Sequence, residues 1–225
     1  MIMKKTKINL QALIMGLGPL CFLWVSCSHK IIHRPVPFDD DRLRLSLEYM
    51  DQRYGIQQEY PHILPTMVVV HWTAINSLER SWKAFEGSRL PGSREAIKGA
   101  SLLNVSAHYL IDRDGTIYRL MPDTLFARHV IGLNHCAIGI ENIGSDAEPL
   151  TDEQLKANTF LIKHLADKFP IEYVIGHHEY TAFRSHKLWK EKDPNYLTSK
   201  TDPGDEFMGR LRKRLSSLGI KGPPN

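Results

Sequence analysis

The sequence predicts an α/β fold in which helices pack on the faces of a mixed central β-sheet. Short apolar runs that suit buried strands alternate along the chain with longer stretches whose apolar residues recur at helical spacing. An Asp-Gly turn at 112–115 separates two runs of alternating apolar residues, which is typical of a β-hairpin. The hairpin adds antiparallel pairing, whereas the interleaved helices favour parallel strands, so the sheet is expected to be mixed.

The individual elements follow from periodicity and from residues that start or end helices. Buried strands are expected at 67–70, 137–141 and 173–175, and the hairpin strands at 105–111 and 116–120. Helices are expected at 39–54, at 76–86 after the capping pair Asn76 and Glu79, at 151–169 after Thr151 and Gln154, and at 207–218. The segment 180–199 has no clear period and is either a lid over a site or a surface excursion.

Length and composition fit one globular domain. The chain has 225 residues, of which 42% are hydrophobic and 24% charged, so it can bury a sizeable core. The formal net charge of +4 is small and gives no case for nucleic-acid binding. No coiled-coil pattern is present, and we expect a monomer.

The N-terminus resembles an export signal. Lys4, Lys5 and Lys7 precede the apolar run 10–25, which glycine and proline interrupt, so a processed signal is favoured over a membrane span. A serine before Cys27 resembles the lipobox of bacterial lipoproteins, although Trp24 stands where leucine is usual. We expect a signal peptide at 1–27 with lipid attached to Cys27, a tether at 28–38 and a domain at 39–220. The protein would then be an outer-membrane-anchored lipoprotein of the periplasm; the alternative is a plain signal peptide.

Two histidines stand where buried strands end. His71 follows the strand at 67–70, His177 follows the strand at 173–175, and Asp202 lies in a Pro-Gly turn before the last helix. Neutral imidazoles and a carboxylate are the ligands that catalytic zinc takes, usually three of them. The spacing alone is weak evidence, because the chain has 11 histidines and such a side chain often only donates to a carbonyl group.

Several ordered blocks resemble the zinc-dependent N-acetylmuramoyl-L-alanine amidases, a family that shares its fold with T7-type lysozyme and peptidoglycan recognition proteins. The blocks are Val-His-Trp-Thr-Ala at 70–74, Val-Ser-Ala-His-Tyr-Leu-Ile at 105–111, Asp-Arg-Asp-Gly at 112–115, Asn134, Ile-Gly-Ile-Glu at 138–141, Gly-His at 176–177 and Lys-Thr-Asp-Pro-Gly at 200–204. The resemblance implies that His71, His177 and Asp202 bind Zn²⁺. Glu141 falls on the family's catalytic carboxylate and Lys200 on its catalytic lysine.

The resemblance also implies a reaction and a partner. We expect a zinc-activated water to hydrolyse the amide bond between N-acetylmuramic acid and L-alanine in peptidoglycan or in muropeptides. Arg128, His129 and Asn134 border the family's substrate groove and are candidate substrate contacts. His108 and Cys136 are expected in the core. The alternative function is a peptidoglycan-binding module without catalysis, since members of this superfamily that lack the metal ligands bind wall fragments uncut.

Overall fold

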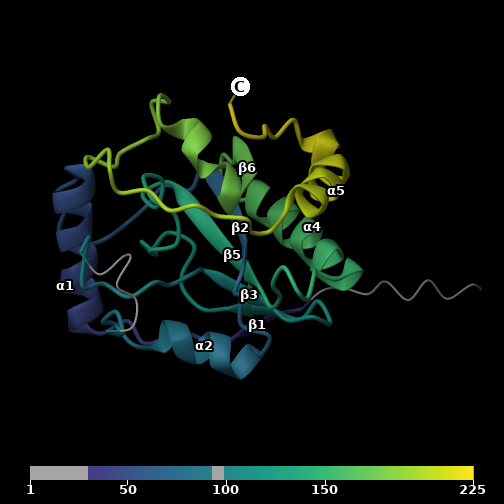
Figure 1. Ribbon diagram of the computed structural model, residues 1–225, viewed down its shortest axis with the longest axis horizontal. Coiled ribbons are helices and arrows are strands. Elements are labelled where there is room, and N and C mark those ends of the chain that lie inside the picture. Colours follow the sequence, from purple (N-terminus) through teal and green to yellow (C-terminus); the bar gives the residue numbers. More distant parts are fainter. Residues whose placement is uncertain (1–29, 93–98, 225) are drawn as a thin grey trace, which may run out of the picture.

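A mixed β-sheet forms the centre of the protein. The computed structural model describes residues 30–92 and 99–224, and within these residues the sheet has six strands in the order β1-β4-β3-β5-β2-β6 (Figure 1). The strands are β1 (Ile31–His33), β2 (Met67–Trp72), β3 (Tyr109–Ile111), β4 (Ile117–Arg119), β5 (Ala137–Asn142) and β6 (Tyr173–Gly176). Strands β3, β5, β2 and β6 are parallel, β4 is antiparallel to β3, and β1 is parallel to β4. The predicted α/β class and mixed sheet are confirmed.

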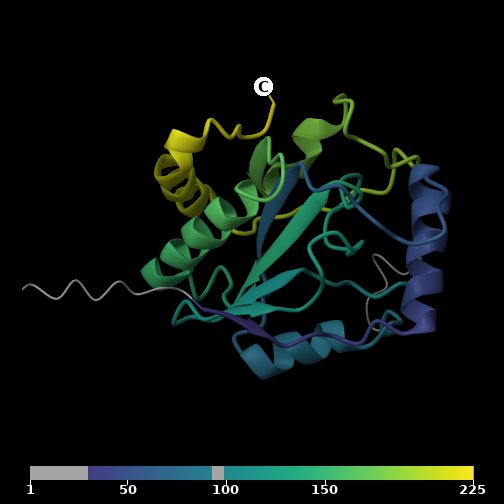
Figure 2. The same cartoon turned by 180° about the vertical axis from the view of Figure 1, so that it is seen from behind.

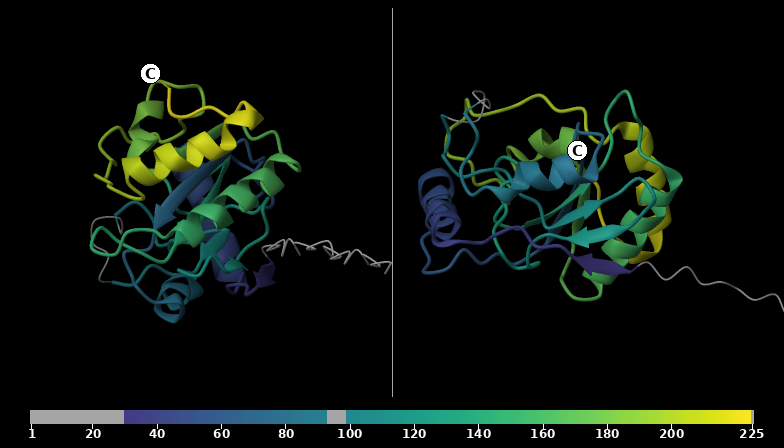
Figure 3. Two further views of the ribbon diagram at one scale, coloured as in Figure 1. Left: turned by 90° about the vertical axis from the view of Figure 1, so that its right-hand side faces the viewer. Right: turned by 90° about the horizontal axis from the view of Figure 1, so that it is seen from below.

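Helices cover both faces of this sheet. Helices α4 (Asp152–Ala166) and α5 (Asp205–Leu215) lie together on one face, whereas α1 (Asp40–Tyr49) and α2 (Leu78–Glu86) lie toward the other side (Figures 2 and 3). Helix α1 continues as a π-helical turn, η1 (Met50–Tyr54), and the short 3-10 helices η2 (His177–Phe183) and η3 (Ser216–Leu218) follow β6 and α5. In the described part of the chain no helix is long and apolar enough to cross a membrane.

Alternate residues of the central strands enter different cores. Val68 and Val70 pack with Ile138 and Ile140 against α4 and α5. Met67 and Val69 point the other way and pack with residues of the loop before β5 and of the helical turn after β6. Because side chains alternate across a strand and both faces are covered, the central strands are apolar throughout.

The helix starts show which local signals were predicted correctly. Asp39 caps α1 by accepting a hydrogen bond from the Arg42 backbone N–H at 2.8 Å. Thr151 and Gln154 form the predicted capping box of α4. The predicted cap of α2 was wrong by one residue: the Ser77 hydroxyl, not Asn76, accepts from the Arg80 N–H.

The predicted tether at 28–38 is wrong over most of its length. Residues 31–33 pair with β4 as a parallel edge strand, and the chain stays paired as the Val36 N–H donates to the Leu120 carbonyl at 3.0 Å. Val36 is buried in an apolar cluster with Phe85 and Leu110. These contacts satisfy the backbone of a segment that would otherwise be solvated, so the folded domain begins at about Ile31 and not at residue 39. At the other end, Lys221 pairs with Tyr173, one residue beyond the predicted boundary.

The predicted signal peptide at 1–27, the lipidation site Cys27 and the first residues of the tether lie outside the described residues. They remain predictions from the sequence.

Candidate metal centre

The candidate site is built on the carboxyl ends of three neighbouring parallel strands. His71 in β2 is in register with Glu141 in β5, and on the other side of β2 the pair Val70 and Gly176 brings the following residue, His177, alongside His71. Residues in register on neighbouring strands point to the same face. The sheet therefore presents His177, His71 and Glu141 side by side at one edge.

Asp202 completes a cluster of converging ligand atoms. The His71 Nδ1 lies 2.9 Å from the His177 Nδ1, and the Asp202 Oδ2 lies 3.2 Å and 3.1 Å from these two nitrogen atoms. Bonds of about 2.0–2.1 Å to zinc would place neighbouring ligand atoms of a tetrahedral site about 3.3 Å apart. The three side chains are buried and form a group that could bind a metal ion. This donor set and its spacing fit zinc with a position left open.

Burial keeps the histidine ligand His177 neutral and the aspartate charged. Burial, aided by the nearby His71, lowers the pKa of His177 to about 4. Burial alone would raise the pKa of Asp202, but hydrogen bonds with His177 and His71 outweigh it and hold this pKa well below its usual range. A neutral imidazole and an ionised carboxylate are the forms that bind a metal.

His178 holds the loop that carries Asp202, and Gly176 leaves room for this loop to pack closely. The backbone N–H and the Nδ1 of His178 both lie 2.9 Å from the Asp202 carbonyl oxygen, and its Nε2 lies 2.9 Å from Asp205. A Cβ on Gly176 would meet the His178 ring at 2.7 Å and Pro203 at 2.9 Å. Only glycine at 176 therefore lets the end of β6 approach the Asp202 loop this closely. His178 faces the backbone of the Asp202 loop, whereas His177 faces the ligand cluster.

Glu141 and Lys200 lie beside this cluster. Both line a cavity of about 240 Å³ together with His71, His177 and Asp202. Glu141 is half-buried at the end of β5, and Lys200 is exposed at the mouth of the cavity. The structure therefore brings together all the predicted metal ligands and both predicted catalytic residues in one cavity.

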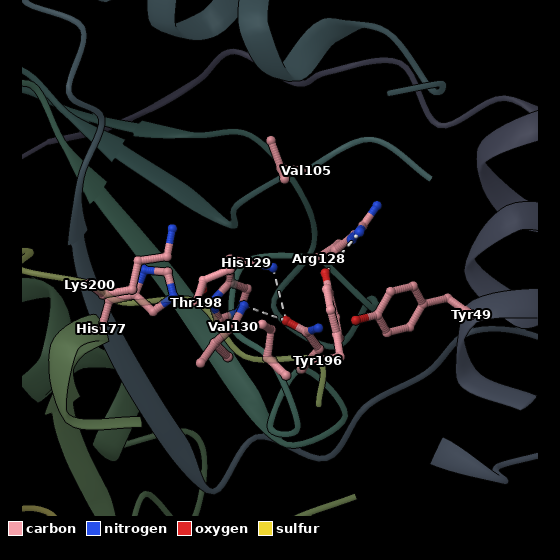
Figure 4. Close-up of a pocket in the computed structure, with 11 residues that line it drawn as sticks. Tyr49, Val105, Arg128, His129, Val130, His177, Tyr196, Thr198 and Lys200 are labelled. Carbon is pink, nitrogen blue, oxygen red and sulfur yellow. Dashed lines mark hydrogen bonds between the residues drawn. The ribbon is translucent and has the colours of Figure 1, made fainter. Parts of the chain in front are cut away.

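A smaller, more apolar cavity of about 60 Å³ continues from the first. His129, His177 and Lys200 line both, and Tyr49, Tyr196 and Thr198 line only the smaller one. In Figure 4, Lys200 and His177 lie at one end, Tyr49 at the other, and Tyr196 and Arg128 between them. Tyr49 and Thr198 were not predicted from the sequence, because nothing in helix α1 signals a contact with residues so distant in the chain.

One wall of the smaller cavity comes from the segment 180–199, which is fastened to η1. The Arg53 guanidinium forms an ion pair with the fully buried Glu191 carboxylate at 2.7 Å and lies over the Tyr196 ring, 4.6 Å from its centre. The Lys192 backbone N–H donates to the Arg53 carbonyl oxygen at 3.0 Å. The segment is a fixed wall of the site and not a detached surface excursion.

Two of the three candidate substrate contacts, Arg128 and Asn134, are buried and bonded within the protein. Arg128 is buried, donates to the Ser101 and Leu103 carbonyl oxygens and to the Tyr196 hydroxyl, and stacks on Tyr49. The side chain of Asn134 is fully buried: its Oδ1 accepts from the His129 and Val130 N–H groups and its amide donates to the Tyr54 hydroxyl. These two side chains are engaged in shaping the groove, which does not favour direct substrate contact.

His129 is half-buried and lies against a metal ligand. Its Nδ1 is 3.1 Å from the His71 Nε2, and its Nε2 is 3.2 Å from the Ala137 carbonyl oxygen. Burial lowers its pKa well below the usual value, and the neighbouring His71 and His108 act in the same direction. Nothing in the sequence distinguished this contact from the predicted substrate contact.

His108 and Cys136 are core residues, as predicted. The His108 Nε2 donates to the Leu125 carbonyl oxygen at 2.8 Å, and its Nδ1 accepts from the Gly139 N–H at 3.0 Å. Burial raises the pKa of the Cys136 thiol to about 12, so the thiol stays protonated. A core histidine with both nitrogens bonded has no capacity left to bind a metal.

Fold and site together define a class of protein: an α/β domain with a buried His-His-Asp cluster, a carboxylate and a lysine at the carboxyl edge of its sheet. The sequence profile of the N-acetylmuramoyl-L-alanine amidase family matches residues 59–205, more than half of the chain. The protein belongs to this family. Among curated proteins no match to the chain was found.

The chain is also similar to solved structures. The N-acetylmuramoyl-L-alanine amidase LysC from Clostridium intestinale URNW is 20% identical, with a TM-score of 0.51 over 86% of this chain and 100% of that one. A selenomethionine derivative of AmpD is 24% identical, with a TM-score of 0.49 over 82% of this chain and 93% of that one. Bumblebee PGRP-SA is 20% identical, with a TM-score of 0.48 over 88% and 99%.

Proposed function

We propose that the protein is a zinc-dependent amidase that hydrolyses the bond between N-acetylmuramic acid and L-alanine in peptidoglycan or its fragments. Membership of the amidase family supports the substrate class. The observation that carries the proposal is the cluster of His71, His177 and Asp202, whose ligand atoms lie 2.9–3.2 Å apart beside Glu141. A module that only bound peptidoglycan would have no need for a carboxylate and a lysine next to three metal ligands.

His71, His177 and Asp202 would hold the metal. When bound, zinc supplies Lewis acidity, which lowers the pKa of water from about 15.7 to near 7 and polarises a carbonyl group. With two neutral imidazoles and one carboxylate, the protein leaves a net positive charge at the site, so the electrophilic character of the ion is only partly neutralised.

Glu141 is the general base and then the general acid. Its carboxylate takes a proton from the attacking water and returns it to the leaving nitrogen of L-alanine, and a positioned carboxylate of this kind contributes about 10²–10⁴-fold in rate. It stands one strand away from His71 in register, so it shares the face that the ligands occupy.

Lys200 stabilises negative charge on the carbonyl oxygen of the scissile amide. Its ammonium group reaches both cavities from the exposed side, where the two halves of the substrate would meet. Donors placed toward such a charge contribute about 3 kcal/mol in comparable sites.

Zinc content and muropeptide turnover of two variants test these roles. In Glu141→Ala and Lys200→Ala we expect zinc to be retained and turnover to fall about 100-fold or more, because neither side chain is a metal ligand. Lys187→Ala, which removes an exposed lysine outside both cavities, is the control and should keep wild-type turnover. Wild-type turnover in either site variant would refute the assigned roles. Muropeptide binding without hydrolysis by the zinc-loaded wild type would favour the recognition module instead.

We further propose that the protein is exported and anchored by lipid on Cys27 in the outer membrane, facing the periplasm. The lysine-led apolar run before Cys27 supports export. Cys27→Ser should move the protein from the membrane to the soluble periplasmic fraction. Membrane retention of this variant would argue against the lipid anchor.

A further inference from the structure

His129 has a bonding pattern that determines where its protons lie. Its Nε2 lies 3.2 Å from the Ala137 carbonyl oxygen, which can only accept, so this nitrogen carries the proton. In a neutral imidazole the other nitrogen is then an acceptor.

The same reasoning locates the proton on the Nε2 of the metal ligand His71. The His129 Nδ1, as an acceptor, lies 3.1 Å from the His71 Nε2, so the His71 Nε2 carries a proton and donates it. When His71 binds a metal, its lone pair is therefore supplied by Nδ1. That atom is the one that faces His177 and Asp202, at 2.9 Å and 3.2 Å.

A glycine in the neighbouring strand makes room for this arrangement. Gly139 in β5 is in register with Val69, two residues before His71 on the same face of the sheet. A Cβ on Gly139 would lie 2.7–2.9 Å from three atoms of the His129 ring. The ring lies flat against the strand only because residue 139 has no side chain, an observation independent of the hydrogen bonds.

We propose that His129 is a positioning residue for the metal site, which fixes the tautomer and orientation of His71 through the chain Ala137 carbonyl, His129, His71. It acts through His71 and does not contact substrate. The inference rests on the proposed zinc function. Outer-shell partners that fix a histidine ligand commonly change metal affinity about 10- to 100-fold when they are removed.

Three replacements of His129 separate this role from others. In His129→Asn the Oδ1 takes the place of Nδ1 and still accepts from His71, whereas His129→Gln keeps a donor for the Ala137 carbonyl but no acceptor at the Nδ1 position. His129→Leu removes both. Gly139→Ala keeps the histidine at position 129 but displaces its ring, since the alanine Cβ would overlap the ring atoms.

Zinc affinity, measured on the full chain by competition with a chelator, is the test. We expect the dissociation constant to rise about 10- to 100-fold in His129→Leu, His129→Gln and Gly139→Ala, and to stay within about threefold of wild type in His129→Asn. An unchanged zinc affinity in folded His129→Leu would overturn the proposal. So would an Asn variant as weak as the Gln variant, a comparison that holds even if the Leu variant does not fold.

Nitrogen-15 NMR of the imidazoles in the metal-free wild type provides a readout that needs neither zinc nor activity. The inference predicts that Nε2 carries a proton in both His71 and His129. An unprotonated Nε2 at either ring would contradict it. If the wild type binds no zinc at all, the proposed function fails, while the tautomer measurement still decides the bonding chain.

Discussion

Buried histidines surround the candidate metal centre, and their neutrality has a cost at low pH. Burial lowers the pKa of His108 to about 4, and that of His177 to about 4 as well. Both imidazole rings are therefore neutral in the folded protein at neutral pH. Histidines in the unfolded chain have a pKa of about 6.5, so below this pH the unfolded state binds protons that these buried histidines do not bind in the folded state.

This difference predicts acid destabilisation. Between pH 6.5 and about 4 the unfolded state binds one more proton at position 108, so the free energy of unfolding falls as pH falls through this window, by about 2 kcal/mol at pH 5. Urea denaturation at pH 7 and pH 5, with chelator present, measures it. His108→Asn, which keeps an acceptor for the Gly139 N–H, should lose about this much of the pH dependence. An equal pH dependence in the variant would refute the assignment.

Single residues were predicted to different extents. His71, Glu141, His177, Lys200 and Asp202 were identified because they stand in ordered blocks that resemble a family, and the structure places them in one cavity. The contact of His129 with His71 was not predictable, because 58 residues separate them and the pairing depends on how β5 and the preceding loop pack.

At the scale of elements, the wall formed by 180–199 depends on one buried ion pair. The Glu191 side chain is fully buried and pairs with Arg53, whose guanidinium also supports Tyr196. Removing one partner of a buried pair leaves the other charge without compensation and typically costs about 3–5 kcal/mol.

We therefore expect Glu191→Ala to lower the free energy of unfolding by about 3 kcal/mol and to raise KM for muropeptides, because Tyr196 loses its support. Denaturation and steady-state kinetics measure the two effects. Asp193→Asn is the matched control: Asp193 lies 3.7 Å from Arg53 with a 45% exposed side chain, so its effect should stay below about 1 kcal/mol. Equal effects of the two changes would show that burial of the pair is not the cause.

Elements with local signals were predicted well. The capping residue Thr151 and the Asp-Gly turn act within a few residues, so the sequence displays them directly. The edge strand β1 was missed because it has three residues and pairs with β4, which lies more than 80 residues further along the chain. Parallel pairing of this kind has no local signature.

At the scale of the whole molecule, β1 relates the proposed anchor to the site. β1 runs opposite to β2, so Ile31 lies at the same edge as the site, in a row that passes through Ile117, Ile111 and Asn142 to Trp72. Four strand spacings make this row about 19 Å long. Only three residues separate Cys27 from Ile31. The four Cα–Cα steps between them span at most about 14 Å.

The proposed anchor would thus hold the site close to the membrane. Inserting about 20 Gly-Ser residues between Cys27 and Lys30 should raise turnover of intact sacculi by the membrane-bound protein several-fold, because the longer link extends its reach. Turnover of soluble muropeptides, the internal control, should not change. A ratio of the two activities that the insertion leaves unaltered would contradict this geometry.

The most direct test of the central claim is mass spectrometry of the products formed from a purified muropeptide by the full-length protein. We predict a glycan with a free lactyl carboxylate and a peptide that begins with L-alanine, with turnover abolished by a zinc chelator and restored by added zinc. Intact substrate, cleavage at any other bond, or turnover that resists the chelator would contradict the assignment of a zinc-dependent amidase.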